Sequence, residues 1–209
     1  MMQVLLQGGP LVWVLLAVGA VGLLVFLERL LHLHRAKIRS EDFLQGLFRN
    51  LEYGHVEEAL RVCEETPGPV AYLAKTAILH RDNDPEAFKR ALDNGGRAEI
   101  SRMERRLLIL ATTAQVAPLL GLLGTVLGLV RALLIMNQRG PLVQFSDLSG
   151  WLMQALVTTA LGLLVAIPAY GGYNFLINKV EKIVLDMERA ASEITAFIQA
   201  QRIAGVRRE

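Results

Sequence analysis

Three long stretches of this sequence contain no Asp, Glu, Lys or Arg, namely residues 1–27, 107–130 and 148–178. Charged residues make up 20% of the 209 positions and fall almost entirely between and after these stretches. About 20 apolar residues in a helix cross the ~30 Å hydrocarbon core of a bilayer. We therefore predict an all-α membrane protein with three transmembrane helices, of which the second and third are long and extend into the cytoplasm.

Other scarcities exclude further classes of protein. The single cysteine, Cys63, cannot form an internal disulfide. A cleaved signal peptide has basic residues before its apolar run. The first apolar run of this sequence has none before it, so we expect it to be retained. No segment alternates with period two, which argues against a β-sheet. Nucleophile elbows, phosphate loops and metal-ligand spacings are also missing, so we expect no enzyme, no cofactor and no metal site.

Basic residues give the orientation. They cluster over 29–39, 97–106 and 179–189, which all flank one side of the membrane, whereas the other side has Arg139 and possibly Arg131. The positive-inside rule then places the N-terminus outside and the C-terminus in the cytoplasm. The predicted segments are an external lead over 1–9, a transmembrane helix over 10–31, a cytoplasmic helical portion over 32–106, a transmembrane helix over 107–136, an external turn over 137–150, a transmembrane helix over 151–177 and a cytoplasmic helix over 178–209.

The cytoplasmic portion is predicted to consist of short helices, including about 55–65, about 70–81 and one that begins at 85 and can run straight into the second membrane helix. Such short helices form a weak core alone, so we expect them to pack against neighbouring subunits. The C-terminal helix carries a series of positions, apolar except for the last, that step alternately by four and three and form a narrow seam suited to a partner helix. These positions are Leu176, Val180, Ile183, Met187, Ala190, Ile194, Phe197 and Gln201.

The stretch over 117–130 is rich in glycine for a lipid-facing helix. Glycines three and four residues apart share one helix face and let another helix approach closely. We therefore predict that this helix faces protein and that it packs against a stripe of small residues on the third membrane helix. The predicted packing residues are Pro118, Gly121, Gly124, Gly128, Gly162 and Pro168.

Polar side chains within the membrane helices are few, and two readings of them stay open. Thr125 and Thr159 either bond to a carbonyl one turn back within a packed interface, or line a polar path between neighbouring chains. A hydroxyl both donates and accepts, so it can relay a proton without burying a charge. Thr158 and Gln154 belong to the same candidate path. Arg131 either extends to the membrane surface, or it pairs with an anionic group of a partner or sets the electric field at the outer mouth.

Two sequence motifs suggest a family. Residues 117–126 read APLLGLLGTV and residues 155–169 read ALVTTALGLLVAIPA, followed by Tyr173 and Asn174. In this order and topology they resemble the second and third membrane helices of the MotA/TolQ/ExbB proton-channel family, and of its ExbB and TolQ members in particular. The resemblance implies an inner-membrane location with a periplasmic N-terminus, and a role in biopolymer transport driven by the proton-motive force.

The same resemblance implies a homopentamer whose second and third helices surround a pore. That pore would hold the membrane helices of an ExbD- or TolR-like dimer, which supplies the titrating carboxylate and energises a TonB- or TolA-like effector. Thr125 and Thr159 match the family's two pore-facing threonines. Gln154 stands where ExbB proteins commonly have a glutamate. The alternative is a non-conducting scaffold that anchors partner helices through its small-residue faces.

Overall fold

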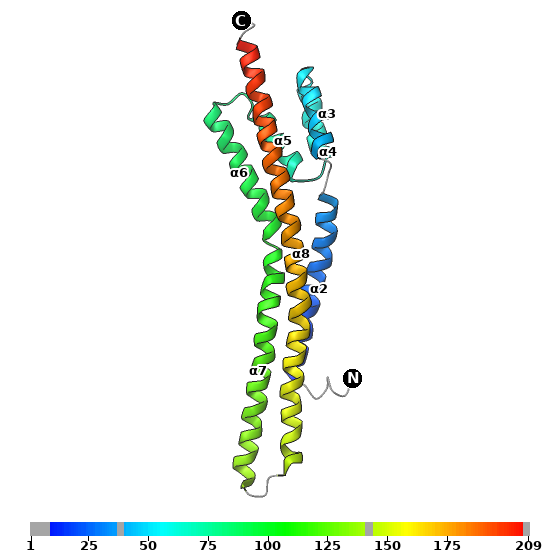
Figure 1. The fold of residues 1–209 in the computed structure, drawn as a ribbon, viewed down its shortest axis with the longest axis vertical. Coiled ribbons are helices and arrows are strands. Elements are labelled where there is room, and N and C mark those ends of the chain that lie inside the picture. The colour runs from blue at the N-terminus through cyan, green and yellow to red at the C-terminus, as the bar shows by residue number, and fades with distance from the viewer. Residues whose placement is uncertain (1–8, 37–39, 141–143, 207–209) are drawn as a thin grey trace. The chain divides into compact units, whose positions relative to one another are not determined.

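The computed structural model describes residues 9–36, 40–140 and 144–206, and these residues form seven helices without a β-strand (Figure 1). The helices are α2 (Pro10–Ala36), α3 (Ser40–Glu52), α4 (Val56–Glu65), α5 (Pro69–Leu79), α6 (Pro85–Glu104), α7 (Leu107–Arg139) and α8 (Phe145–Val206). Three helical stretches are long and apolar enough to cross a membrane. The predicted fold class is confirmed. The predicted segments also include residues 1–8, 37–39, 141–143 and 207–209, which lie outside the described residues.

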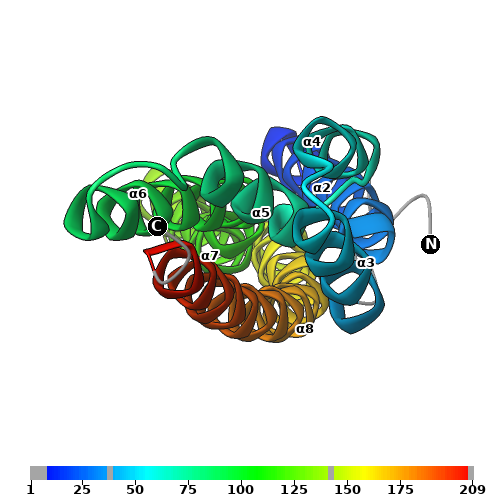
Figure 2. The ribbon, with the colours of Figure 1, turned by 90° about the horizontal axis from the view of Figure 1, so that it is seen from above.

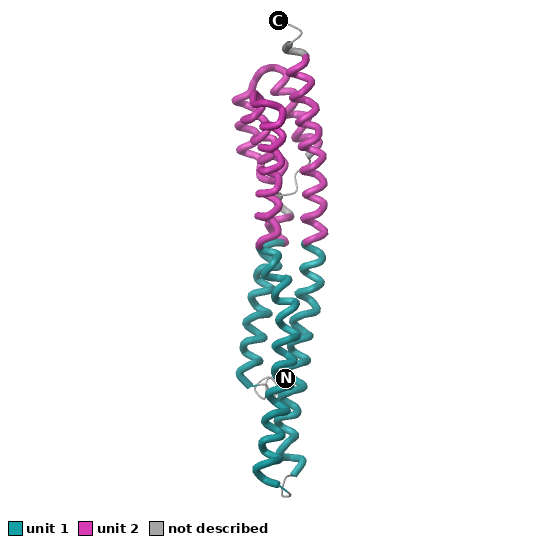
Figure 3. Tube along the Cα trace, turned by 90° about the vertical axis from the view of Figure 1, so that its left-hand side faces the viewer, with its two compact units in different colours: residues 1–29, 106–176 teal, residues 30–105, 177–209 magenta. Residues whose placement is uncertain are grey.

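The chain divides into two compact units, shown in Figure 3. Unit 1 comprises residues 1–29 and 106–176, and unit 2 comprises residues 30–105 and 177–209. Helix α8 has 62 residues and belongs to both units. A turn at Arg105 and Arg106 separates α6 from α7. The sequence was compatible with a single helix that continues from residue 85 into the second membrane helix.

Unit 1 consists of α2, α7 and the first part of α8, which lie side by side (Figures 1 and 3). Pro10 begins α2, since its fixed φ and missing N–H suit a first helical turn. Glycines bring α2 close to both neighbours. A Cβ on Gly22 would lie 2.9 Å from the Thr113 methyl, and one on Gly19 would lie 3.1 Å from Val165. Small residues on α2 therefore set its distance from α7 and α8.

An ion pair joins α2 and α7 where their apolar stretches meet charge. Arg106, just before α7, donates to the carboxylate of Glu28. Further into unit 1, Leu15, Ala117 and Ala166 form a buried cluster with one residue from each helix. The ion pair marks one end of the apolar part of unit 1.

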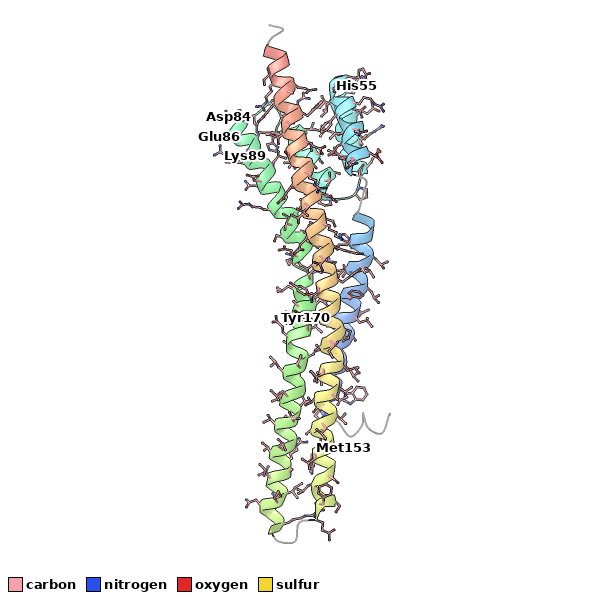
Figure 4. The ribbon with its side chains drawn as sticks, in the orientation of Figure 1. His55, Asp84, Glu86, Lys89, Met153 and Tyr170 are labelled. Carbon is pink, nitrogen blue, oxygen red and sulfur yellow. The ribbon has the colours of Figure 1, made fainter. Side chains whose placement is uncertain are left out.

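Unit 2 packs its helices in chain order, so that α5 lies between α4 and α6 (Figure 2). Helix α6 begins at the residues labelled Asp84 and Glu86 in Figure 4, where the Asp84 carboxylate accepts a hydrogen bond of 3.2 Å from the Glu86 N–H. Large apolar side chains fill this unit. Those that are buried include Leu44, Leu47, Leu73, Ile78, Phe88 and Leu92.

The seam on α8 is covered by helices of the same chain within unit 2. Val180, Met187 and Ile194 are at most 2% exposed. Near the end of α8, the Phe197 ring stacks on Phe48 of α3 with centroids 4.6 Å apart. The seam that predicted a partner helix thus already has partners in its own chain.

Candidate functional site

Helices α7 and α8 approach each other closely at the predicted small residues. A Cβ on Gly121 would lie 3.1 Å from both the Thr158 carbonyl oxygen and Thr159 Cα. One on Gly162 would lie 2.7 Å from the Ala117 carbonyl oxygen. These neighbours are backbone atoms, which cannot rotate away as a side chain can. Any larger residue here must push the helices apart.

The same contact continues toward the α7–α8 connection. A Cβ on Gly128 would lie 2.7 Å from the Ala155 methyl. Beside Gly124 the space is filled by Thr158, which is 1% exposed. The Thr158 hydroxyl donates to the Ala155 carbonyl at 2.9 Å. In the single chain Thr158 is therefore a packing residue between the two helices.

Thr159 and Thr125 use their hydroxyls differently. The Thr159 hydroxyl donates to the Gly121 carbonyl of α7 at 3.1 Å, a bond between helices. The Thr125 hydroxyl donates to the Leu122 carbonyl of its own helix at 2.6 Å. Both side chains are half-buried. Each oxygen keeps lone pairs that can accept a further hydrogen bond.

Both of these threonines lie on the side of the α7–α8 pair away from α2. With 3.6 residues per turn, Thr125 is about 120° around α7 from Thr113, the residue that contacts α2. On α8, Thr159 is about 120° from Val165, the other contact of α2. Gly121, which contacts α8, points between the directions of Thr113 and Thr125 on α7. Gly162, which contacts α7, points between the directions of Val165 and Thr159 on α8. The structure therefore brings Thr125 and Thr159 to one face, about one helical turn apart.

Gln154 lies elsewhere in unit 1. A Cβ on Gly9, next to the start of α2, would lie 2.2 Å from the Gln154 amide nitrogen. Gln154 is thus on the α2 side of α8 and apart from Thr125 and Thr159 in the single chain. Of the four predicted path residues, Thr125 and Thr159 lie on the face away from α2, Thr158 lies between α7 and α8, and Gln154 lies beside α2.

The two predicted proline positions do not interrupt their helices. Pro118 is half-buried, one turn before Gly121, and Pro168 is exposed. Each lacks the N–H that would bond to the carbonyl four residues earlier. In a membrane such a carbonyl needs another hydrogen-bond donor.

Sequence reasoning missed one polar side chain on the Thr159 face. Tyr170, labelled in Figure 4, follows Thr159 by about three helical turns and is 61% exposed. A spacing of eleven residues on a helix is the signal that could have found it. The phenol extends the polar face along α8.

Two contacts join α7 to α8 near their connection. The Arg131 guanidinium lies over the Trp151 ring, 5.0 Å from its centroid. Arg139 forms an ion pair of 2.6 Å with Asp147, which also accepts from the Gln144 N–H. The hydrogen bond from Arg139 holds the pKa of the Asp147 carboxyl below its usual range. Among the described residues no group of three metal-ligating side chains occurs.

Comparison with known proteins decides the family. Residues 65–189 match the model of the MotA/TolQ/ExbB proton channel family. This chain belongs to that family. The resemblance seen in the two motifs is therefore confirmed, and the family is one of channel proteins rather than enzymes.

Individual relatives carry the names ExbB and TolQ. The chain is 44% identical over 94 residues to the biopolymer transport protein ExbB of Aquifex aeolicus. The aligned region covers 45% of this chain and 63% of the relative. The chain is 34% identical over 121 residues to the Tol-Pal system protein TolQ of Haemophilus influenzae, covering 56% and 53%. With ExbB of Neisseria gonorrhoeae it shares 28% over 188 residues, covering 83% and 84%. The chain thus spans less than two thirds of the first two relatives.

Proposed function

We propose that this protein is a proton-channel subunit of the cell inner membrane, with its N-terminus in the periplasm and its C-terminus in the cytoplasm. In this proposal it forms a homopentamer around the membrane helices of an ExbD- or TolR-like partner. The complex couples the proton-motive force to a TonB- or TolA-like effector that spans the periplasm. The family membership and the ExbB and TolQ relatives support this role.

The observation that carries the proposal is the shared face of Thr125 and Thr159. Both lie away from α2, so a ring of α7–α8 pairs with α2 outside would turn both hydroxyls toward the centre. Thr159 is tied to the α7 backbone by its 3.1 Å hydrogen bond, which fixes the oxygen in place. Fixed oxygens are suited to accept from a protonated group that passes them.

The partner is needed because the chain cannot supply the charge itself. None of the three charge-free stretches contains an Asp or Glu. A carboxyl group on the partner's helix would take up a proton, pass the hydroxyls as the neutral acid and release the proton on the other side. One charge moved through 100 mV supplies about 2.3 kcal/mol, so a large conformational step needs several protons.

A non-conducting scaffold is the second candidate, and the close contacts at Gly121, Gly128 and Gly162 favour it equally. The two functions differ in what they ask of the hydroxyls. A scaffold needs only the shape of the threonine side chain, which valine keeps. A proton path needs the oxygen.

The test uses the complex co-purified with its partner and reconstituted in vesicles. Thr125→Val and Thr159→Val should each lower proton uptake roughly twofold to tenfold, the effect of losing a hydrogen bond worth about 0.5–1.5 kcal/mol from the neutral acid. Thr112→Val is the matched control, because its hydroxyl bonds to the Leu108 carbonyl of α7 in the same way and is exposed.

The outcomes separate the candidates. Unchanged proton uptake in both variants, with intact assembly, would show that the two hydroxyls do not form the proton path. No proton uptake by the assembled wild-type complex would leave the scaffold as the function. Native mass spectrometry of the same samples counts the subunits, and a stoichiometry other than five would contradict the proposed pentamer. Thr159→Ser should retain most of the uptake, since serine keeps the hydroxyl.

A further inference from the structure

The Arg131–Trp151 pair lies about one bilayer thickness along α7 from the Glu28–Arg106 ion pair. Arg131 is about 37 Å along α7 from Arg106 at 1.5 Å per residue. Arg106 pairs with Glu28 at the opposite end of the apolar part of unit 1. A bilayer has a hydrocarbon core of about 30 Å and measures about 40–45 Å with its headgroups. If one end of α7 is at one headgroup layer, Arg131 is therefore at the other.

The pair also lies on the side of α7 and α8 away from the threonine face. Arg131 follows Thr113 by about five full helical turns, so it points in the direction in which Thr113 meets α2. It is about 120° around α7 from Thr125. Trp151 is one turn beyond Gln154, which contacts Gly9 beside the start of α2. If α2 lies on the outside of a ring of subunits, this side of the α7–α8 pair faces away from the centre of the ring.

The Trp151 ring fixes the guanidinium without neutralising it. A cation over an indole face is attracted by the ring, and a planar guanidinium keeps its N–H groups available at its edge. The nearest acidic position along α8, Asp147, is already paired with Arg139. No described carboxylate forms an ion pair with Arg131, and the undescribed segments 1–8 and 141–143 contain no Asp or Glu.

Exposed apolar side chains lie near Arg131 along α7. Val130, the preceding residue, is 46% exposed, and Leu134, one turn further on, is 53% exposed. Acyl chains can cover such surfaces while a phosphate meets the guanidinium, which binds phosphate oxygens through two parallel N–H bonds. Tryptophan at this depth is typical of the membrane interface.

We propose that Arg131 and Trp151 form a binding site for the phosphate group of an anionic phospholipid in the outer half of the membrane. The site holds the outer ends of α7 and α8 at a fixed depth. It favours a lipid with net negative charge over a zwitterionic lipid. In a zwitterionic lipid the phosphate already has a positive group of the same headgroup beside it, whereas in an anionic lipid the phosphate can pair with Arg131 alone. This proposal does not depend on whether the protein conducts protons.

The experiment uses Trp151 as its own reporter. The full-length Trp13→Phe variant, whose remaining tryptophan is Trp151, is reconstituted in vesicles of equal phosphatidylglycerol and phosphatidylcholine. In one sample only the phosphatidylglycerol carries brominated acyl chains, and in the other only the phosphatidylcholine does. Quenching should show about a fivefold preference for phosphatidylglycerol, the size of a single charge contact near 1 kcal/mol.

Arg131→Gln should abolish this preference, so that both lipids quench Trp151 equally. Arg131→Lys should retain part of it, since lysine keeps the charge but not the planar guanidinium. The matched control is Trp151→Phe, in which Trp13 reports. Trp13 is 67% exposed on α2, and its quenching should not change with Arg131→Gln. Oligomer size on a native gel confirms that each variant assembles.

Three results would overturn the proposal. Equal quenching of Trp151 by both lipids would mean that headgroup charge is not recognised. No quenching by either lipid would mean that the pair faces protein, such as an acidic partner segment. Loss of the preference on adding inorganic phosphate would mean that a free anion, rather than a lipid headgroup, occupies the site.

Discussion

Helix α8 contains two kinds of packing surface in one continuous element. From Ala155 to Ala166, within unit 1, its buried positions are small, with Ala155, Gly162 and Ala166 against α2 and α7. In unit 2 they are large, as at Met187 and Ile194. Water drives large apolar side chains together outside a membrane, but lipid is as apolar as leucine and gives no such force. Unit 1 therefore depends on backbone proximity, and unit 2 depends on buried volume.

The largest effect should come from enlarging a small residue in unit 1. Gly162→Leu places its side chain against the Ala117 carbonyl and the Gly121 backbone, which lie 2.7–3.0 Å from the added Cβ. We expect loss of assembly, seen as disappearance of the native oligomer by native mass spectrometry. Gly171→Leu is the control, because nothing lies within 4 Å of its added Cβ. If the Gly162 variant assembles normally, the close approach of α7 and α8 is not required.

The converse change in unit 2 should destabilise that unit alone. Leu47→Ala removes a fully buried side chain and should cost about 2–5 kcal/mol. Cys63 reports on it, because its thiol is buried and burial raises its pKa to about 11. Labelling by a thiol reagent requires opening of the unit. The labelling rate should increase by a factor between tens and thousands, because each loss of about 1.4 kcal/mol raises the open fraction tenfold.

Two controls define this result. Leu79→Ala, at a position that is 59% exposed, should leave the labelling rate nearly unchanged. Gly162→Leu should also leave Cys63 protected if the two units are stabilised independently. Fast labelling of Cys63 in that variant would show that packing in unit 1 is needed for unit 2, and would break the comparison between them.

A smaller effect on stability is expected at Thr159. Thr159→Val removes the hydrogen bond to the Gly121 carbonyl but keeps the shape. Such bonds between membrane helices are worth about 0.6 kcal/mol on average. The thermal midpoint followed by Trp151 fluorescence should therefore shift only slightly, while proton uptake falls. A variant that dissociates instead would make this hydroxyl structural.

Much of this fold can be predicted from the sequence because its causes are local. The lengths of the charge-free stretches predict the membrane helices, and Pro10 and Pro85 begin α2 and α6. The turn at 105–106 is not predictable in this way, because the sequence there favours a continuous helix. The glycine spacing also predicts which face of α7 is small, since that follows from helix geometry alone.

What each polar residue contacts depends on the other helices and could not be read locally. Gly124 and Thr125 are adjacent in the sequence, yet the first lies against Thr158 and the second on the face away from α2. The Glu28–Arg106 ion pair joins residues that are 78 positions apart. The position of Gln154 beside Gly9 likewise requires knowing where α2 begins.

The smallest effect is expected where the contact is polar and open to solvent. Asp147→Asn removes the ion pair with Arg139 at the α7–α8 connection. Exposed ion pairs contribute little, so the thermal midpoint at pH 7 should barely change. The pKa of Asp147 is lowered by Arg139, so its contribution is present above the ordinary pKa of about 3.9 and is lost only as the pH falls through the lowered value. The difference between wild type and Asp147→Asn should therefore stay constant from pH 7 to about pH 5. A difference that disappears within that range would show that the pKa of the Asp147 carboxyl is raised above its ordinary value, and that Arg139 does not lower it.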